Sequence, residues 1–386
     1  MWVMSASWAD ATRLLCVRLD AIGDVLMTGP AMKALREART GRSLTLLTSP
    51  AGASAARLMP AVDESIVYEA PWMKHGGRGP ESAPDAAMVE RLREGGFDAA
   101  AIFTVYSQSP LPAALLCHLA EIPLRAAHCR ENPYRLLTDW LREPEPDALV
   151  RHEVRRQLDL AASLGARSGD APIELEPPPA AGRRVAALLA ELGLSGRSDW
   201  LVVHPGSTAP SRRYPAEAYA AACRELASEH GLGLVFTGSA EERELVESIR
   251  AELPATSTFA GELDVAELAA LLEQAPLLLA GNSGPVHLAA AAGTPVVVLY
   301  ALTNPQHTPW GVPSRVLFHD VRCRWCYGSV CREGHHLCLR GVDPGEVAAA
   351  VVELLGEPAQ NSPRYSEQPW QTPGGLPLSS PSRKLR

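Results

Sequence analysis

Gly23 and Asp24 follow a strand-like run, residues 13–19, and open a stretch with helical spacing. Ligands of parallel sheets bind beyond the carboxyl ends of the strands, and glycine lets the backbone come close to a ligand. A carboxylate at this place can take the proton of an attacking hydroxyl group. The same position also suits an N-cap, in which the Asp24 carboxylate would accept free amides of the first turn. Asp20, another carboxylate at the strand end, is a rival for the role of base.

A second polar segment, residues 204–208, follows the strand-like run 200–203 and precedes Arg212. Small residues such as Ser207 and Thr208 leave backbone amides open to an anion, and the arginine guanidinium binds phosphate oxygens through two parallel hydrogen bonds. We therefore predict that this segment binds a diphosphate. The alternative is an ordinary surface loop followed by solvated arginines.

The segment 280–287 carries the strongest phosphate signal, because it lies between a predicted strand and a predicted helix that begins near Gly284. Helix N-termini bind phosphate through their unpaired amides and the positive end of the helix dipole. Ser283 adds a hydroxyl group and Asn282 an amide. His287 lies one turn into the helix, where it either faces the same phosphate or has a structural role.

Residues 237–242 form a fourth segment between a strand and a helix, and they include Glu241 and Glu242. A carboxylate near a strand end holds ribose hydroxyl groups in dinucleotide-binding folds. The alternative is that both glutamates only favour the N-terminus of the following helix. Together, the four segments predict a nucleotide-diphosphate-sugar donor in the second half of the chain and an acceptor in the first half.

Four of the eight cysteines are clustered beside a pair of histidines, namely Cys323, Cys326, Cys331 and Cys338. Thiolates at such spacing can close a tetrahedral zinc or iron site, and a reducing cytosol favours metal over disulfides. The sequence predicts a structural zinc or iron here, with free or redox-labile thiols and a disulfide as open alternatives. We expect no catalytic part for this cluster.

The elements that position these segments alternate between strand-like and helix-like runs in both halves of the chain, which predicts parallel sheets covered by helices. The 386 residues exceed what one hydrophobic core supports. We predict an N-terminal domain at 1–170, a Pro-rich linker at 171–181, a C-terminal domain at 182–356 that includes the Cys-rich segment 323–338, and a disordered tail at 357–386.

A net charge of −8 and a pI near 5.8 argue against a nucleic-acid-binding protein. We interpret the local arginine clusters, such as Arg155 and Arg156, as solvated helix faces. Residues 1–10 lack the pattern of a signal peptide, and no apolar run reaches the length that spans a bilayer. We therefore expect a cytoplasmic protein.

The chain resembles glycosyltransferase family 9, the heptosyltransferase family of lipopolysaccharide core assembly. The resemblance extends over residues 13–355 and is carried by five stretches, 18–35, 152–160, 204–215, 236–242 and 281–300. The early Gly-Asp pair and the late Ser-Gly-Pro-x-His motif are its most specific parts.

This resemblance implies a GT-B fold, in which two doubly wound Rossmann-like domains face each other across a cleft, and an inverting, metal-independent transfer. It makes Asp24 the catalytic base, beside Gly23 in the acceptor-side loop. It places Arg212 at the donor phosphates, where the family usually has a lysine. The donor diphosphate is then held by the backbone amides of Ser283 and Gly284.

The resemblance also places Glu241 or Glu242 at the ribose of the donor. Asn282 stands where the family commonly has an aspartate, so donor choice can differ, and ADP-heptose is the default donor. The implied acceptor is a lipid-linked saccharide, which would bring the protein to the inner face of the inner membrane. No cofactor is required for the transfer itself.

Two other functions stay open at the level of the sequence. The same fold serves nucleotide-sugar 2-epimerases, which would convert the nucleotide sugar without any acceptor. A non-catalytic protein that binds a nucleotide sugar or a metal would keep its function after Asp24 is replaced.

Overall fold

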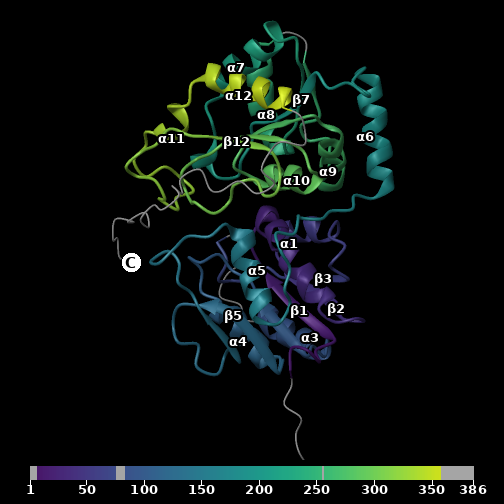
Figure 1. Cartoon of the computed structure of the whole chain (residues 1–386), viewed down its shortest axis with the longest axis vertical. Helices are drawn as coiled ribbons and strands as arrows, with labels where there is room; N and C mark the ends of the chain where they lie inside the picture. The colour runs from purple at the N-terminus through teal and green to yellow at the C-terminus, as the bar shows by residue number, and fades with distance from the viewer. Residues whose placement is uncertain (1–6, 75–82, 254–255, 358–386) are drawn as a thin grey trace, which may run out of the picture. The chain divides into compact units, whose positions relative to one another are not determined.

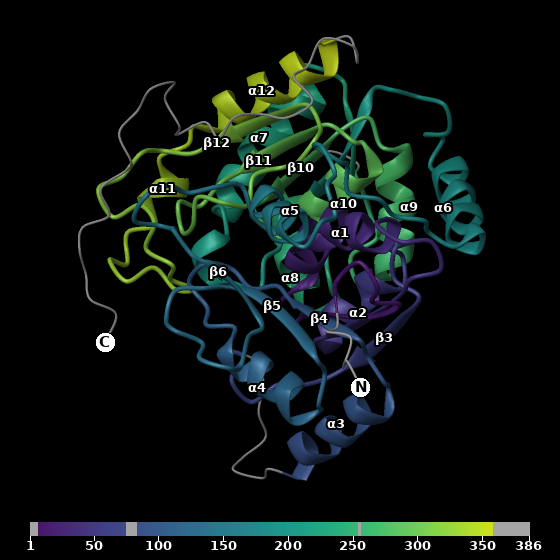
Figure 2. The same ribbon diagram turned by 60° about the horizontal axis from the view of Figure 1, so that its bottom comes forward.

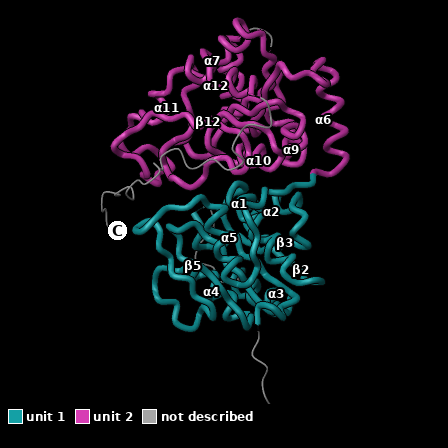
Figure 3. Tube along the Cα trace, in the orientation of Figure 1, with its two compact units in different colours: residues 1–176 teal, residues 177–386 magenta. Residues whose placement is uncertain are grey.

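The computed structural model describes residues 7–74, 83–253 and 256–357. The chain forms two compact units, Met1–Glu176 and Pro177–Arg386 (Figure 3). The break between them falls inside the Pro-rich stretch 171–181, but Pro179 already begins a helix. Proline fits the first turn of a helix because its missing N–H would have no partner there. Residues 358–386, which make up nearly all of the predicted disordered tail, lie outside the described residues.

Unit 1 is a parallel sheet of six strands with the order β3-β2-β1-β4-β5-β6. The order reverses direction between β1 and β4, which makes this pair the topological switch point of the sheet. Its elements are β1 (Arg13–Arg18), α1 (Ile22–Glu37), β2 (Ser43–Thr48), α2 (Pro50–Ala56), β3 (Glu64–Val67), α3 (Ala83–Glu94), β4 (Ala99–Ile102), α4 (Leu111–Leu119), β5 (Leu124–Cys129), β6 (Asp139–Arg142) and α5 (Glu153–Ser163).

Unit 2 repeats this topology with the strand order β12-β11-β10-β7-β8-β9, all parallel, so its switch point lies between β7 and β10. Figures 1 and 2 show its strands and the surrounding helices from two directions. The elements are α6 (Pro179–Glu191), β7 (Trp200–His204), η1 (Pro210–Arg212), α7 (Ala216–Ser228), β8 (Gly233–Phe236), η2 (Ala240–Glu242), α8 (Arg243–Arg250), β9 (Ser257–Thr258), α9 (Val265–Gln274), β10 (Leu278–Gly281), α10 (Gly284–Ala292), β11 (Val296–Leu299), β12 (Ser314–Leu317), α11 (Leu337–Arg340) and α12 (Pro344–Gly356).

The alternation of side chains along β1 decides what faces each side of the sheet in unit 1. Leu15 and Val17 belong to the core cluster that includes Leu92 of α3 and Cys117 of α4. Successive side chains of a strand point to opposite faces, so Arg18 lies on the other face. Helices α1 and α5 pack against each other there (Figure 1).

The edge strands β6 and β12 carry little signal of a strand in their own sequences. Their burial patterns explain this, since every residue of both strands is half-buried or exposed and neither segment is a continuous apolar run. Strand pairing across the sheet, rather than local composition, makes these segments β.

The arginine cluster of α5 is only partly solvated, which corrects the interpretation above. Arg156 is 1% exposed, and its Nε donates to Glu143 Oε2 at 2.8 Å. A buried arginine needs such a carboxylate partner. No helix in the described part of the chain combines the length and apolar character that a membrane span requires.

Candidate active site

Arg18, the last residue of β1, joins three carboxylates at the switch point of unit 1. Its buried guanidinium lies 2.9 Å from Asp20 Oδ2 through Nε, 3.1 Å from Asp24 Oδ1 through Nη2, and 2.9 Å from Glu153 Oε1 through Nη1. Burial alone would lower the pKa of Arg18, but the carboxylates, Asp20 first, outweigh it and raise the pKa. A permanently charged group therefore fixes the directions of these acidic side chains.

Asp24 lies in the first turn of α1, two residues after Ile22, with 18% of its side chain exposed. The N-cap of this helix is Ala21, and no side chain caps it. The alternative of Asp24 as an N-cap is therefore wrong, because its carboxylate pairs with Arg18 instead. Gly23 is buried in the same turn.

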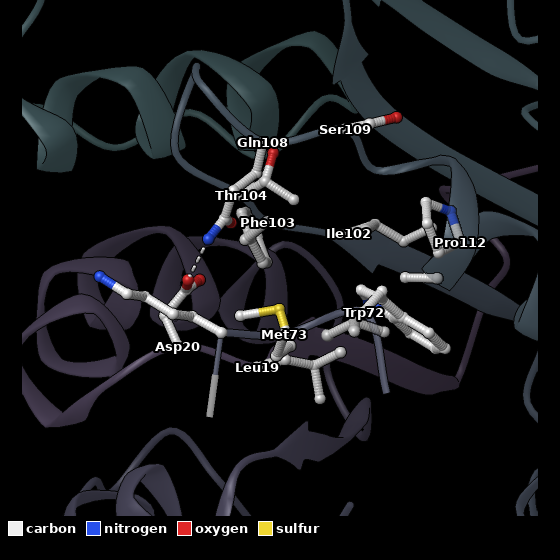
Figure 4. A pocket seen from close by; sticks show the side chains of 13 residues that line it. Leu19, Asp20, Trp72, Met73, Ile102, Phe103, Thr104, Gln108, Ser109 and Pro112 are labelled. Atoms are coloured by element: carbon white, nitrogen blue, oxygen red, sulfur yellow. Dashed lines mark hydrogen bonds between the residues drawn. The ribbon is translucent and has the colours of Figure 1, made fainter. Parts of the chain in front are cut away.

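Asp20 faces a cavity of about 390 Å³ at the same end of the sheet. Gln108 Nε2 donates to Asp20 Oδ1 at 2.6 Å, and Figure 4 shows this pair at one side of the cavity. Burial raises the pKa of the Asp20 carboxyl to about 6, although the Arg18 charge opposes this. The switch point thus holds three carboxylates on one guanidinium, of which Asp20 lines the cavity.

The loop after β7 in unit 2 lies against the carboxylate of Glu242. A Cβ atom on Gly206 would lie 2.1 Å from the carboxyl carbon of Glu242, so only glycine leaves room for that side chain as it stands. His204 Nε2 is 3.7 Å from Glu242 Oε2, and burial lowers the pKa of His204 while Glu242 opposes the change. In the same loop, Ser207 is buried and Thr208 exposed.

Glu242, and not Glu241, is the acidic residue that approaches this loop. Its Oε2 also accepts a hydrogen bond of 2.8 Å from Ser239 N as part of a capping box. The exposed Glu241 has a pKa lowered by hydrogen bonds at the same helix start. Glu242 therefore supports the helix start, and its carboxylate also borders the strand end. Its place at the ribose stays a prediction.

Arg212 and Arg213 follow the same loop but are used differently. Arg213 Nε donates to Ser207 O at 2.7 Å and so holds the loop. Arg212 Nη1 reaches Asn282 O at 3.4 Å, and Arg212 Nε is buried without a hydrogen-bond partner among the described residues. A buried donor without a partner is costly, so Arg212 is the arginine of this pair with bonding capacity left for a ligand.

The loop between β10 and α10 presents backbone rather than charged side chains. Ser283 occupies the N-cap of α10, but its hydroxyl group does not cap the helix and lies 3.3 Å from Gly281 O. Gly284 begins the helix. His287, one turn further, is buried, with its ring centroid 6.4 Å from that of His307. The start of α10 therefore has the form of an anion site.

The side chain of Asn282 is turned toward the backbone of Ala301. Its Oδ1 accepts from Ala301 N at 3.1 Å, and its Nδ2 donates to Ala301 O at 3.3 Å. An aspartate could make the first of these hydrogen bonds but not the second. Asn282 thus sets the position of the loop, and any influence of this residue on the donor would act through that position.

The cysteine cluster does not form a set of metal ligands in the described residues. Cys323 Sγ lies 3.6 Å from His335 Nε2, and all four thiols are half-buried and free. No group of three or more His, Cys, Asp or Glu side chains in the described ranges is arranged to hold a metal ion. The zinc or iron site at these cysteines therefore stays a prediction.

The sequence analysis missed Arg18, Glu153 and Gln108 as members of the site. Arg18 did carry a signal, because it is a charged residue at the end of an otherwise apolar strand. Glu153 and Gln108 carried none, since each meets β1 or its loop only through the fold.

The comparisons with known proteins agree with this picture. The model of glycosyltransferase family 9 (heptosyltransferase) matches residues 86–337. Lipopolysaccharide heptosyltransferase 2 of Salmonella typhimurium is 26% identical over 361 residues, which cover 89% of this chain and 99% of the relative. The family match includes the loops of unit 2 after β7 and before α10.

Solved structures share the fold of the whole chain. The glycosyltransferase family 9 protein of Veillonella parvula has a TM-score of 0.74 at 22% identity, covering 91% of this chain and 98% of that one. ADP-heptose lps heptosyltransferase II of E. coli has a TM-score of 0.67 at 23% identity, covering 89% and 98%. The fold is accordingly GT-B, and the chain belongs to glycosyltransferase family 9, the heptosyltransferase family.

Proposed function

We propose that this glycosyltransferase moves a heptose from ADP-heptose to a lipid-linked saccharide of the lipopolysaccharide-core kind. The names of its relative in Salmonella and of its structural neighbour in E. coli support the sugar and the nucleotide. One observation carries the proposal. Two sheets of the same topology bear different groups at their switch points, a held carboxylate in unit 1 and an anion-binding loop in unit 2.

In the proposed reaction, Asp24 removes the proton from the acceptor hydroxyl group. The acceptor oxygen then attacks the anomeric carbon, the bond from that carbon to the diphosphate oxygen breaks, and ADP leaves with both bonding electrons. The configuration at the anomeric carbon is inverted. Arg18 holds the Asp24 carboxylate through Nη2, so the base is already oriented before the acceptor binds.

On the donor side, negative charge develops on the departing diphosphate. The amides at the start of α10, from Ser283 and Gly284, and the Arg212 guanidinium stabilise it. The spare bonding capacity of Arg212 Nε supports this role. Glu242 receives the ribose hydroxyl groups beside Gly206, and Ser207, Thr208 and His287 border the same ligand.

Two further proposals concern the cysteine cluster and the place of the protein in the cell. Cys323 and His335 would begin a structural zinc or iron site that needs Cys326, Cys331 and Cys338 to move closer. The transfer itself uses no metal.

The protein would work in the cytoplasm against the inner membrane face. The exposed leucines of α4, Leu115 at 45% and Leu119 at 49%, are consistent with peripheral contact there.

A donor panel tests the proposal with the purified full chain. ADP-, UDP- and GDP-sugars are compared by thermal shift, and each is then incubated with and without a deacylated lipopolysaccharide core acceptor. We expect stabilisation by ADP-heptose and acceptor-dependent release of ADP. Preference for UDP- or GDP-sugars would contradict the donor, and an altered nucleotide sugar formed without acceptor would indicate the epimerase.

Arg212→Met should remove most of the stabilisation by ADP-heptose. Arg224→Met is the matched control, because Arg224 is an exposed arginine of α7 that pairs with Glu252. Equal donor binding by both variants would show that Arg212 does not bind the diphosphate.

A further inference from the structure

The cavity beside Asp20 lies at the switch point of unit 1, where β1 and β4 end. Its volume of about 390 Å³ falls in the range of small-molecule sites, roughly 300–1,000 Å³. The wall comes from the ends of both strands, from the segment after β3 and from the start of α4 (Figure 4). Nothing in the donor chemistry above uses this space.

Most of the wall is apolar. Trp72, Met73 and Phe103 contribute to it, and Figure 4 shows them around the same opening as Leu19. Trp72 is held in place by an edge-to-face contact with Tyr68, with ring centroids 5.7 Å apart. A half-buried aromatic ring in such a wall offers a flat apolar surface to a ligand.

The polar end of the cavity is rich in hydrogen-bond acceptors. Asp20 Oδ1 takes one hydrogen bond from Gln108, and Oδ2 pairs with Arg18, so each carboxylate oxygen keeps a lone pair. The Gln108 side chain, whose amide nitrogen donates to Asp20, also lines the cavity. A ligand that donates several hydrogen bonds and has an apolar face suits this arrangement, whereas a phosphate would meet the carboxylate. Among the described residues that line the cavity, Lys74 is the one cation.

A neutral sugar has these two properties, since its hydroxyl groups donate and its C–H faces are apolar. We infer that this cavity binds a neutral sugar unit of the acceptor, with Trp72 against the ring and Asp20 and Gln108 on its hydroxyl groups. The inference rests on the proposed function and deepens it. Arg18 binds both Asp20 and Asp24, so one guanidinium connects the polar end of this cavity to the proposed base.

The test uses saturation-transfer NMR on the full chain with two probes, methyl α-D-mannopyranoside and methyl glucuronide. We expect saturation of the neutral glycoside and about tenfold weaker binding in Trp72→Ala and in Gln108→Leu, the scale of a lost aromatic or polar contact. Trp140→Ala is the control, because Trp140 is also a half-buried tryptophan of the same core cluster but does not line the cavity.

The urea concentration at the unfolding midpoint shows whether Trp72→Ala still folds. Trp72→Phe keeps an aromatic ring and should restore most of the glycoside binding. Equal binding by the wild type and both cavity variants overturns the inference, as does a preference for the charged glucuronide. The donor panel separates the two failures. If ADP-heptose stabilises the protein but glycoside binding is the same in the wild type and in the Trp72 and Gln108 variants, this subsite is refuted. The proposed function then stands.

Discussion

The two sheets share one strand order, yet their switch points are built from different parts of the chain. In unit 1 the groups are charged side chains, collected around the buried Arg18. In unit 2 they are mainly backbone, at Gly206 and at the start of α10, with Arg212 as the nearby cation. We propose that the same fold thereby supplies a proton acceptor in one unit and an anion site in the other.

This difference predicts that substitutions at the two switch points cost different amounts of stability. Side-chain charges that are buried together depend on one another, because removing one leaves the others without a counter-charge. A backbone site carries no charge of its own that must be balanced before the ligand binds. We therefore expect substitutions at the unit 1 switch point to cost more stability than substitutions at the unit 2 switch point.

The largest effect is expected for Arg18→Met, which leaves three carboxylates around an apolar side chain. The free energy of unfolding should fall by about 3–5 kcal/mol, the usual cost of breaking a buried ion pair on one side. Urea denaturation measures it. Arg36→Met is the control, since Arg36 pairs with Asp63 at the surface and should lose at most about 1 kcal/mol. A similar loss in both variants would show that burial of the Arg18 cluster adds nothing to the cost of losing its arginine.

The next effect concerns turnover rather than folding. Asp24→Asn keeps the shape of the side chain but removes the base, so turnover should fall about 100-fold or more. Donor affinity, measured by calorimetry, should change little. Glu37→Gln, at the far end of the same helix with 65% exposure, should behave as the wild type. Unchanged turnover in Asp24→Asn would exclude Asp24 as the base and make Asp20 the candidate for that role.

A smaller effect is expected in unit 2 for Asn282→Asp. The new carboxylate would face the Ala301 carbonyl oxygen, to which Asn282 Nδ2 now donates, and this should cost about 1–3 kcal/mol of stability. Asn132→Asp is the matched control, because only Oδ1 of Asn132 is used, by Tyr134 N. If both variants unfold at the same urea concentration, the hydrogen bond to Ala301 contributes nothing.

The smallest effect follows from Asp20. Burial raises its pKa from 3.8 to about 6, so the folded state binds this proton more tightly than the unfolded state. The resulting stabilisation is complete below pH 3.8 and is lost as the pH rises through about 6. Compared with Asp20→Asn, the wild type should therefore lose stability across this window, as urea titrations at a series of pH values would show. Parallel pH profiles would contradict the raised pKa.

Much of the fold follows from local patterns. The apolar runs 13–19 and 200–203 predicted the buried strands β1 and β7, because a strand covered on both faces is continuously apolar. The start of α9 also has a local cause, since Asp264 and Glu267 form a capping box there. Edge strands β6 and β12 lack such a run, and only pairing with their neighbours defines them.

By itself, the sequence determined two strand–helix units, the polar segments at their strand ends and the positions of Asp24, Arg212 and Ser283 in or beside those segments. The tertiary structure decided which side chains meet. Glu153 lies 135 residues from Arg18 along the chain, and Gln108 lies 88 residues from Asp20. Local propensities extend over a few residues, whereas these contacts exist because parallel strands bring their carboxyl ends to one edge of the sheet.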